Sequence, residues 1–266
     1  MSLRIVVAVK YVPDATGDRH FAEDLTTDRD AVDGLLSELD EYAVEQALQL
    51  KEAQEDPESV TVTALTVGPE DAATAVTKAL QMGADDGVQV VDDAIAGSDA
   101  LATSKVLAAA IEKIGDVDVV MCGMASTDGG MGVLPAMVAE RLGLPQMTYG
   151  SLVQSKGSEY RVKRDGDTAT EVIGASGRVV IAVTDQSGEP RIGGFKQIVA
   201  AKKKPRETWS LSDLGVDAGE VGLSAAWTTV EGVEARPPRT QGEIVTDEGG
   251  SGAKALADFL ASKKFI

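Results

Sequence analysis

A glycine-rich segment at residues 123–134, GMASTDGGMGVL, is the part of the chain whose residue types best suit a binding site. Glycines allow the backbone to approach a phosphate, and free N–H groups at the start of the following helix would stabilise the anion. Ser126 and Thr127 could add hydroxyl donors. The segment is neither a G-x-G-x-x-G turn after the first strand nor a Walker A lysine loop, which disfavours hydride transfer and phosphoryl transfer. A flexible turn without a ligand is the alternative interpretation.

Two other predicted strand ends would lie beside this segment. The first strand ends at residues 8–10 (AVK), and the second ends at residues 66–69 (TVGP). The carboxyl ends of parallel strands share one edge of a sheet, where doubly wound folds bind their ligands. Together these ends would form a flat crevice whose backbone groups can read an adenine edge. Nucleotide binding is therefore favoured over an empty turn.

A second segment, residues 189–204, suggests docking to another protein. It begins at a Pro-marked turn, carries Ile192, Phe195 and Ile198 at helical spacing, and ends in three consecutive lysines. An exposed turn, an apolar stripe and a cationic end suit a docking helix better than a catalytic site. The alternative is a surface helix whose stripe lies in the core and whose lysines are solvated. Composition alone favours this alternative.

The chain lacks the residues for a proton-transfer or metal site. Its one cysteine, Cys122, excludes an internal disulfide and a multi-thiolate metal site, and its one histidine, His20, excludes a two-histidine mechanism. Cys122 ends an apolar strand and is predicted to be a small buried hydrophobe. His20 lies in a polar loop and is predicted to be solvated. We therefore predict no catalytic residue and no metal site.

Length and charge limit the classes of protein further. With 266 residues, 43% of them hydrophobic, the chain can form one large α/β domain or a domain with an appendage. Its formal net charge of −18 argues against nucleic acid or an anionic membrane as a partner. No apolar run approaches the roughly 18 residues of a membrane span. No signal peptide is recognisable, so we expect a cytoplasmic protein without direct membrane insertion.

Short β-branched strands alternate with amphipathic helices in the first part of the chain. Strands are predicted at residues 4–10, 60–67, 87–91 and 117–122. Helices are predicted at residues 42–50, 70–82, 98–114 and 133–142. Residues 37–41 offer N-cap chemistry for the first helix. This alternation predicts an α/β fold with a doubly wound, mostly parallel, Rossmann-like sheet.

The pattern changes after Pro145. Short strands joined by Gly/Asp turns are predicted as an antiparallel extension of the sheet, at residues 147–154, 160–164, 169–173 and 179–184. Residues 234–252 are rich in Pro, Gly and charge and are predicted to be extended, before a short helix at 253–263. We therefore predict a nucleotide-binding domain at 1–220, which includes a loop at 185–204, and an arm at 221–266 that packs on a partner subunit.

Over nearly its whole length the chain resembles the β subunits of electron-transfer flavoproteins. The resemblance lies in the order and spacing of short motifs rather than in any one of them. These are VAVK at 7–10, AVEQA at 43–47, ALQMGAD at 79–85, the loop at 123–134, LPQ at 144–146, EPR at 189–191, AKKK at 201–204 and LGVD at 214–217.

The resemblance implies an αβ heterodimer with one FAD, held mostly by the α subunit, and a structural AMP held by the β subunit. The AMP contacts of the family fall on Ala8, Ser37, Glu38, Leu39, Asp40, Val67, Gly123, Met124, Ala125, Ser126, Thr127, Asp128, Gly129, Gly130, Met131, Gly132, Val133 and Leu134. Family members often have Asn at the position of Ser37 and Gln near Val133. Because the Val133 side chain cannot form a hydrogen bond, only backbone contacts are expected there. Some relatives bind a second FAD here, but the missing Gln and the short loop favour AMP.

The resemblance also places the family's recognition loop at residues 185–204, with its apolar anchor, usually Leu, on Phe195. The docking residues it implies are Glu189, Pro190, Arg191, Ile192, Phe195 and Ile198, with the lysines as a supporting rim. The implied partners are the α subunit, flavin dehydrogenases such as acyl-CoA dehydrogenase, and a quinone oxidoreductase. The implied function is electron carriage rather than catalysis. A universal-stress-type nucleotide-binding module and an ATP-consuming hydrolase or ligase are the alternatives.

Overall fold

The computed structural model describes residues 3–235, 237 and 241–266. The chain divides into two units, Met1–Glu231 and Gly232–Ile266. In the second unit, the helix α7 (Ser251–Ser262) has no buried residue, and Leu256 and Phe259 on it are exposed. No helix in the described part of the chain is long and apolar enough to cross a membrane.

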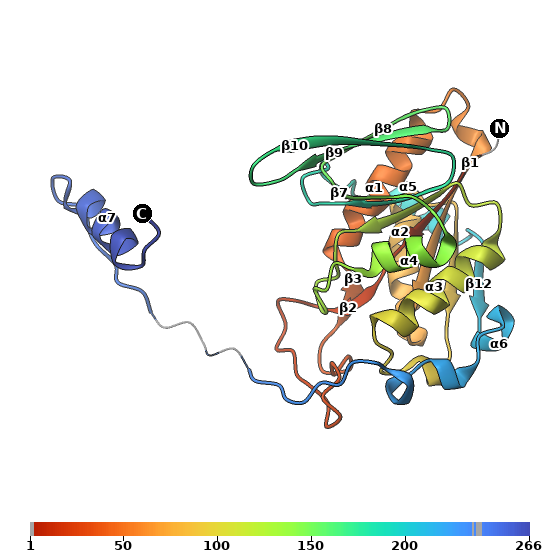
Figure 1. Ribbon diagram of the computed structural model, residues 1–266, viewed down its shortest axis with the longest axis horizontal. Coiled ribbons are helices and arrows are strands. Elements are labelled where there is room, and N and C mark those ends of the chain that lie inside the picture. Colours follow the sequence, from red (N-terminus) through yellow and green to blue (C-terminus); the bar gives the residue numbers. More distant parts are fainter. Residues whose placement is uncertain (1–2, 236, 238–240) are drawn as a thin grey trace. The chain divides into compact units, whose positions relative to one another are not determined.

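The first unit is built on a seven-stranded sheet in which every pair of neighbouring strands is parallel (Figure 1). Its strands are β1 (Leu3–Ala8), β4 (Val60–Val67), β5 (Asp86–Val90), β6 (Val119–Gly123), β7 (Gln146–Gly150), β11 (Val179–Val183) and β12 (Arg206–Trp209). Their order across the sheet is β12-β5-β4-β1-β6-β11-β7. The prediction of a parallel α/β fold is confirmed.

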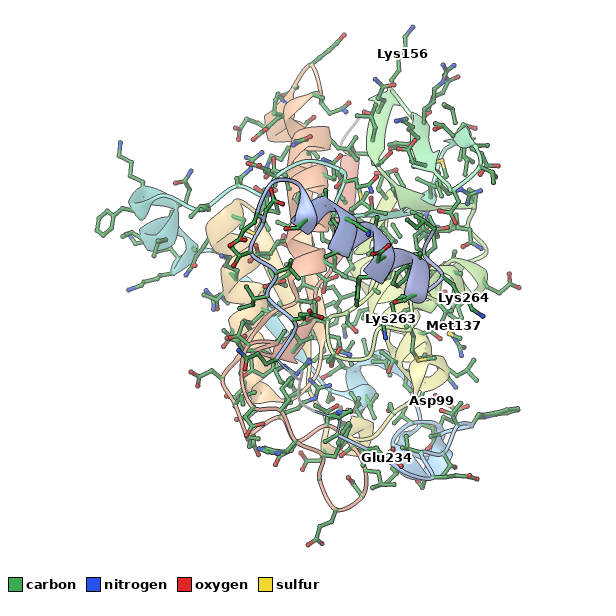
Figure 2. The ribbon with its side chains drawn as sticks, turned by 90° about the vertical axis from the view of Figure 1, so that its left-hand side faces the viewer. Asp99, Met137, Lys156, Glu234, Lys263 and Lys264 are labelled. Atoms are coloured by element: carbon green, nitrogen blue, oxygen red, sulfur yellow. The ribbon has the colours of Figure 1, made fainter. Side chains whose placement is uncertain are left out.

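Helices cover both faces of this sheet. On one face, α1 (Glu38–Glu52) and α2 (Ala73–Met82) bury residues such as Ile5 and Val62. On the other, α3 (Ala100–Ile114) and α4 (Leu134–Leu142) bury residues such as Val6 and Leu65. Alternate residues of one strand thus enter different cores, which explains why the central strands are apolar throughout. Asp99 caps α3 by accepting a hydrogen bond from the N–H of Ala102 (Asp99 is labelled in Figure 2).

The predicted antiparallel strands are present, but two of the four strands assigned to them belong to the parallel sheet. A separate three-stranded antiparallel sheet is formed by β8 (Leu152–Lys156), β9 (Glu159–Asp165) and β10 (Thr170–Ser176), with Lys156 at the turn between β8 and β9 (Figure 2). In contrast, β7 and β11 join the main sheet in parallel. The sequence VVIAV of β11 is buried throughout, as a central parallel strand requires. The strand predicted at 147–154 is interrupted at Gly150, where a Cβ would lie 2.7 Å from Val162 Cγ1.

The remaining elements are short. A two-stranded ribbon pairs β2 (Tyr11–Pro13) with β3 (Gly34–Leu36), and α5 (Phe195–Ala201) and α6 (Leu211–Leu214) lie near the end of the unit. Five 3₁₀ helices complete the described part of the chain: η1 (Pro57–Ser59), η2 (Glu70–Ala72), η3 (Asp93–Ile95), η4 (Ala218–Glu220) and η5 (Leu223–Ala225).

Candidate functional site

The strand order places a switch point between β1 and β6. From β1 the chain adds β4 and then β5 on one side, and it returns to the other side of β1 with β6. Doubly wound sheets bind ligands outside the carboxyl ends of the strands at such a point. Here Lys10 follows β1, the segment 124–133 joins β6 to α4, and α1 begins at Glu38. The structure brings most of the predicted cofactor-binding positions to this one edge, which we call the switch-point crevice.

The amino end of α1 lies directly against the end of β6. A Cβ on Gly123 would lie 2.5 Å from Asp40 Oδ1 and 2.7 Å from the carbonyl oxygen of Leu39. Only a glycine allows this approach. Ser37 is fully buried and does not cap α1 through its side chain, contrary to the predicted N-cap chemistry. Instead its hydroxyl accepts a hydrogen bond from the N–H of Thr127 at 3.4 Å, so Ser37 links α1 to the glycine-rich segment.

Asp128 forms the polar centre of the glycine-rich segment. Its side chain is only 4% exposed, and its two oxygens accept from Lys10 Nζ at 2.8 Å and Arg29 Nη2 at 3.0 Å. Burial alone would raise the pKa of Asp128, but the Lys10 ammonium and hydrogen bonds from Lys10, Ser126 and the Gly129 N–H hold that pKa well below its usual range. Asp128 is therefore ionised and holds two cations at the crevice.

The segment also presents unused backbone donors. The N–H groups of Met131, Gly132 and Val133 donate to no group in the part of the chain that the structure describes. The helix α4 that follows has no side-chain N-cap, and the first N–H groups of a helix lack partners within it. Gly130 has φ +63° and open space around its Cβ position, so a ligand can approach the backbone there. These donors, with Lys10 nearby, can bind an anion.

One buried hydroxyl near the carboxyl end of β4 lacks a partner among the described residues. Thr66, near the end of β4, is fully buried, and its Oγ1 makes no hydrogen bond within residues 3–235, 237 and 241–266. Val67 and Ala8, the adjacent predicted contacts, are half-buried at the same edge of the sheet. A buried hydroxyl without a partner, at the edge of the sheet where the crevice lies, is a group that a polar ligand could satisfy.

Asp40 carries a buried carboxyl group at the centre of the crevice. Burial raises its pKa to about 7, although the N–H groups of Lys10 and Gly123 and the charge of Lys10 partly oppose this shift. Burial, together with the nearby Asp40 carboxylate, raises the pKa of the Cys122 thiol to about 12. Cys122 is thus a buried neutral thiol, as predicted from its place at the end of an apolar strand.

The raised pKa of Asp40 predicts a pH-dependent stability. The carboxyl ionises near pH 3.8 in the unfolded chain and near pH 7 in the folded one. The free energy of unfolding therefore falls as the pH rises from 3.8 to 7. This loss is absent below pH 3.8 and grows to roughly 4 kcal/mol as the pH rises to 7. We expect the Asp40→Asn variant to gain stability relative to the wild type as pH rises from 4 to 7.5. Urea unfolding of both proteins at several pH values measures this; a pH-independent difference would contradict it.

The second predicted segment, 185–204, which we call the docking segment, is exposed where a core helix would be buried. Phe195 begins α5 with 82% of its surface exposed, Ile192 is 89% exposed, and Ile198 and Val199 are also exposed. Only Ala201 of α5 is buried. The stripe therefore does not contribute to the core, and the apolar surface it forms is available to a partner.

Two residues of the docking segment make contacts that the sequence did not reveal. Lys204 is not part of an exposed rim, because its Nζ donates to the carbonyl oxygens of Leu80 and Ala84 at the end of α2. Lys202 and Lys203 are exposed. Arg191 pairs with α1. Glu189 and Pro190, just before Arg191, are exposed and half-buried respectively.

Arg29 and Arg19 were missed as site residues. Both belong to the loop between β2 and β3, in which no site residue was predicted. Arg29 reaches Asp128 and the carbonyl oxygen of Tyr11, and Arg19 Nη1 donates to the carbonyl oxygen of Thr127 at 3.3 Å. The only signal in the sequence is the presence of arginines in an acidic stretch. A pocket of about 530 Å³ was also missed; it lies between Tyr149 at the end of β7 and the antiparallel sheet.

Comparison with known proteins gives consistent matches along the chain. The family model described as "Electron transfer flavoprotein domain" matches residues 24–214. "Electron transfer flavoprotein subunit beta" of Mycobacterium bovis is 42% identical over 264 residues, which covers 98% of this chain and 99% of the relative. The protein of the same name from Clostridium acetobutylicum is 31% identical, covering 98% and 97%. "Acryloyl-CoA reductase electron transfer subunit gamma" of Anaerotignum propionicum is 31% identical, covering 99% and 100%.

Proposed function

This chain belongs to the electron transfer flavoprotein family, and we propose that it is the β subunit of a heterodimeric electron carrier. The observation that carries the proposal is the 42% identity, over 98% of the chain, to a protein named as that subunit. As a β subunit it pairs with an α subunit. The chain is not itself an enzyme, because the redox chemistry belongs to the flavin of the pair.

The switch-point crevice holds a structural AMP. The free N–H groups of Met131, Gly132 and Val133 and the cation of Lys10 would bind its phosphate, with the Thr127 hydroxyl as a further donor. The orphaned Thr66 hydroxyl and the half-buried Ala8 and Val67 would face the nucleoside. The residues present therefore fit AMP. Asp128 contributes indirectly, by holding Lys10 and Arg29 in place.

The heterodimer holds one FAD, mostly within the α subunit, and this chain helps to close the cleft around it. FAD, when bound, supplies the capacity to accept electrons from one flavoprotein and release them to another. The arm that includes the unit Gly232–Ile266 packs on the α subunit, since Leu256, Phe259, Phe265 and Ile266 are exposed apolar residues that need a partner.

The docking segment binds the proteins that reduce the carrier. Phe195 and Ile192 would enter an apolar pocket on a flavin dehydrogenase such as an acyl-CoA dehydrogenase. The α subunit's flavin then receives the electrons and passes them to a quinone oxidoreductase. This function places the chain in the cytoplasm, between substrate oxidation and the respiratory chain.

Co-expression with an α subunit tests the proposal. We expect a yellow complex with one copy of each chain, from which denaturation releases both FAD and AMP in about equal amounts. A colourless, stable monomer would contradict the carrier function. A yellow complex without AMP would contradict only the nucleotide assignment, and a second FAD in its place would identify the crevice as a flavin site.

A second candidate function comes from the relative in Anaerotignum propionicum, named as the electron transfer subunit of an acryloyl-CoA reductase. In that case the chain would carry electrons within a permanent reductase assembly rather than between separate enzymes. Its 31% identity is below the 42% of the carrier subunit, so the carrier is favoured. Stable co-purification with a CoA-ester reductase would reverse this preference. The full-length family match leaves no support for a universal-stress-type module.

A further inference from the structure

The docking segment is fastened to α1 through Arg191. The main-chain N–H and Nε of Arg191 donate to Glu45 Oε2 at 3.1 and 2.7 Å, and Nη2 donates to Glu45 Oε1 at 3.0 Å. Nη1 and Nη2 donate to the two carboxylate oxygens of Glu52 at 2.5 and 3.0 Å. Glu45 and Glu52 lie two turns apart on one face of α1. A single guanidinium therefore spans two turns of the helix.

This contact is unusually costly to break. The side chain of Glu45 is only 7% exposed, whereas that of Glu52 is 57% exposed. Burial alone would raise the pKa of Glu45, but the hydrogen bonds from Arg191 and Gln49 hold that pKa below its usual value. A buried carboxylate that loses its cation is strongly unfavourable. Without Arg191, the Glu45 side chain would turn toward water, and the docking segment would lose its contact with α1.

Apolar contacts hold little of the docking segment in place. Ile192, next to Arg191, is 89% exposed, and Phe195 is 82% exposed. Ala201 is the only residue of α5 that is buried. Because burial of apolar surface is the main source of tertiary stability, these exposed side chains do little to hold the segment. Its backbone is held by polar contacts and by Gly193, where a Cβ would lie 2.3 Å from the carbonyl oxygen of Gln81 in α2.

The polar contacts flank the exposed residues on both sides. Before Arg191, the side chain of Gln46 donates from Nε2 to the carbonyl oxygen of Ser187 at 2.8 Å. After Phe195, Lys204 Nζ donates to the carbonyl oxygen of Leu80 at 3.0 Å. Of these three anchors, Arg191 lies nearest to the exposed residues and makes the most hydrogen bonds.

We infer that Arg191 is a positioning residue that binds α1 rather than the partner and thereby fixes the direction in which Ile192 and Phe195 project. The inference rests on the proposed docking function and reassigns one of its residues. An anchor held in its binding position loses less conformational entropy when the partner binds. Arg191 thus contributes to docking without touching the dehydrogenase.

The test uses the FAD-containing αβ complex as the electron acceptor of an acyl-CoA dehydrogenase that reduces the wild type. We expect Arg191→Gln to raise KM for the complex about tenfold with kcat changed less than about twofold. Arg191→Lys keeps the positive charge but loses the planar guanidinium that binds two carboxylates at once, so it should give an intermediate KM. Trypsin should also cleave faster at the exposed lysines of the docking segment in Arg191→Gln.

Three further variants make the result decisive. Arg141→Gln is the matched control. Arg141 also makes two hydrogen bonds through its guanidinium, to Ser104 and Leu101 of α3, and it is not part of the docking segment. The KM for this variant complex should equal that of the wild type. Glu52→Gln weakens the exposed ion pair between Arg191 and Glu52 and should raise KM about threefold. This variant tests the inference even if Arg191→Gln does not fold. Phe195→Ala tests docking itself.

The outcomes separate the two proposals. If Phe195→Ala raises KM while Arg191→Gln and Glu52→Gln keep the wild-type KM and cleavage rate, docking stands and the positioning role of Arg191 is wrong. If Phe195→Ala leaves KM unchanged, the docking function itself is wrong. A loss of FAD content in Arg191→Gln without a change in KM would also overturn the inference, because it would indicate a purely structural role.

Discussion

The Phe195→Ala variant should lose most of its reduction by a flavin dehydrogenase while keeping its full FAD content. Phe195 is 82% exposed in the isolated chain, so its removal should change folding stability little. An aromatic anchor buried in a partner's pocket typically contributes about 2 kcal/mol or more to binding, which corresponds to a loss of about thirtyfold in kcat/KM. Steady-state reduction of the αβ complex measures the loss, and the absorbance of released flavin measures the FAD content.

Two companion variants define what Phe195 contributes. Phe195→Leu keeps an apolar anchor of smaller volume and should retain most of the activity. Phe21→Ala removes another exposed phenylalanine, 52% accessible, from a polar loop away from α5, and should leave kcat/KM unchanged. If Phe195→Ala reduced as fast as the wild type, the exposed stripe would need a different explanation. If Phe21→Ala were equally impaired, the loss could not be attributed to docking.

Local patterns in the sequence were sufficient for most of the fold. The helix and strand periodicities identified the βα units, and the predicted helix end at residue 82 is confirmed, with Gly83 following at φ +143°. The same patterns could not distinguish a parallel from an antiparallel neighbour for β7 and β11, because that choice depends on the position of distant strands. The apolar run of β11, buried on both faces, was the available signal.

The candidate site was predictable where it depends on backbone and unpredictable where it depends on distant side chains. Gly123 and the segment after it are recognisable because glycines and a helix start suit an anion. Arg29, in contrast, pairs with Asp128 across 99 positions of sequence. Lys204 likewise reaches Leu80 across 124 positions. A charged residue in a sequence carries no sign of its partner, so a lysine run looks solvated even when one member is bound.

The Asp128→Asn variant should weaken both the fold and the retention of AMP. Asp128 is the buried carboxylate between Lys10 and Arg29, and its replacement by an amide leaves both cations without their counter-charge. Because Lys10 and Arg29 are partly exposed, losing the carboxylate costs less than breaking a fully buried pair, roughly 2 kcal/mol. Because the folded pKa of Asp128 is depressed, its stabilising contribution is complete at neutral pH and is lost only as the pH falls below the ordinary carboxyl range. We expect a lower melting temperature at pH 7 and well under one AMP per complex.

Asp24→Asn is the matched control for this effect. Asp24 lies in the loop that also carries Arg29, and among the residues that the structure describes it accepts hydrogen bonds only from Thr26, at 3.0 and 2.6 Å. Its replacement keeps the same change of charge but removes no contact with a cation, so the melting temperature and AMP content should stay near wild type. Thermal unfolding and chromatography of the released nucleotide measure both quantities. If Asp128→Asn retained AMP as the wild type does, Lys10 and Arg29 would not need Asp128 to hold the crevice, and the phosphate would depend on backbone N–H groups alone.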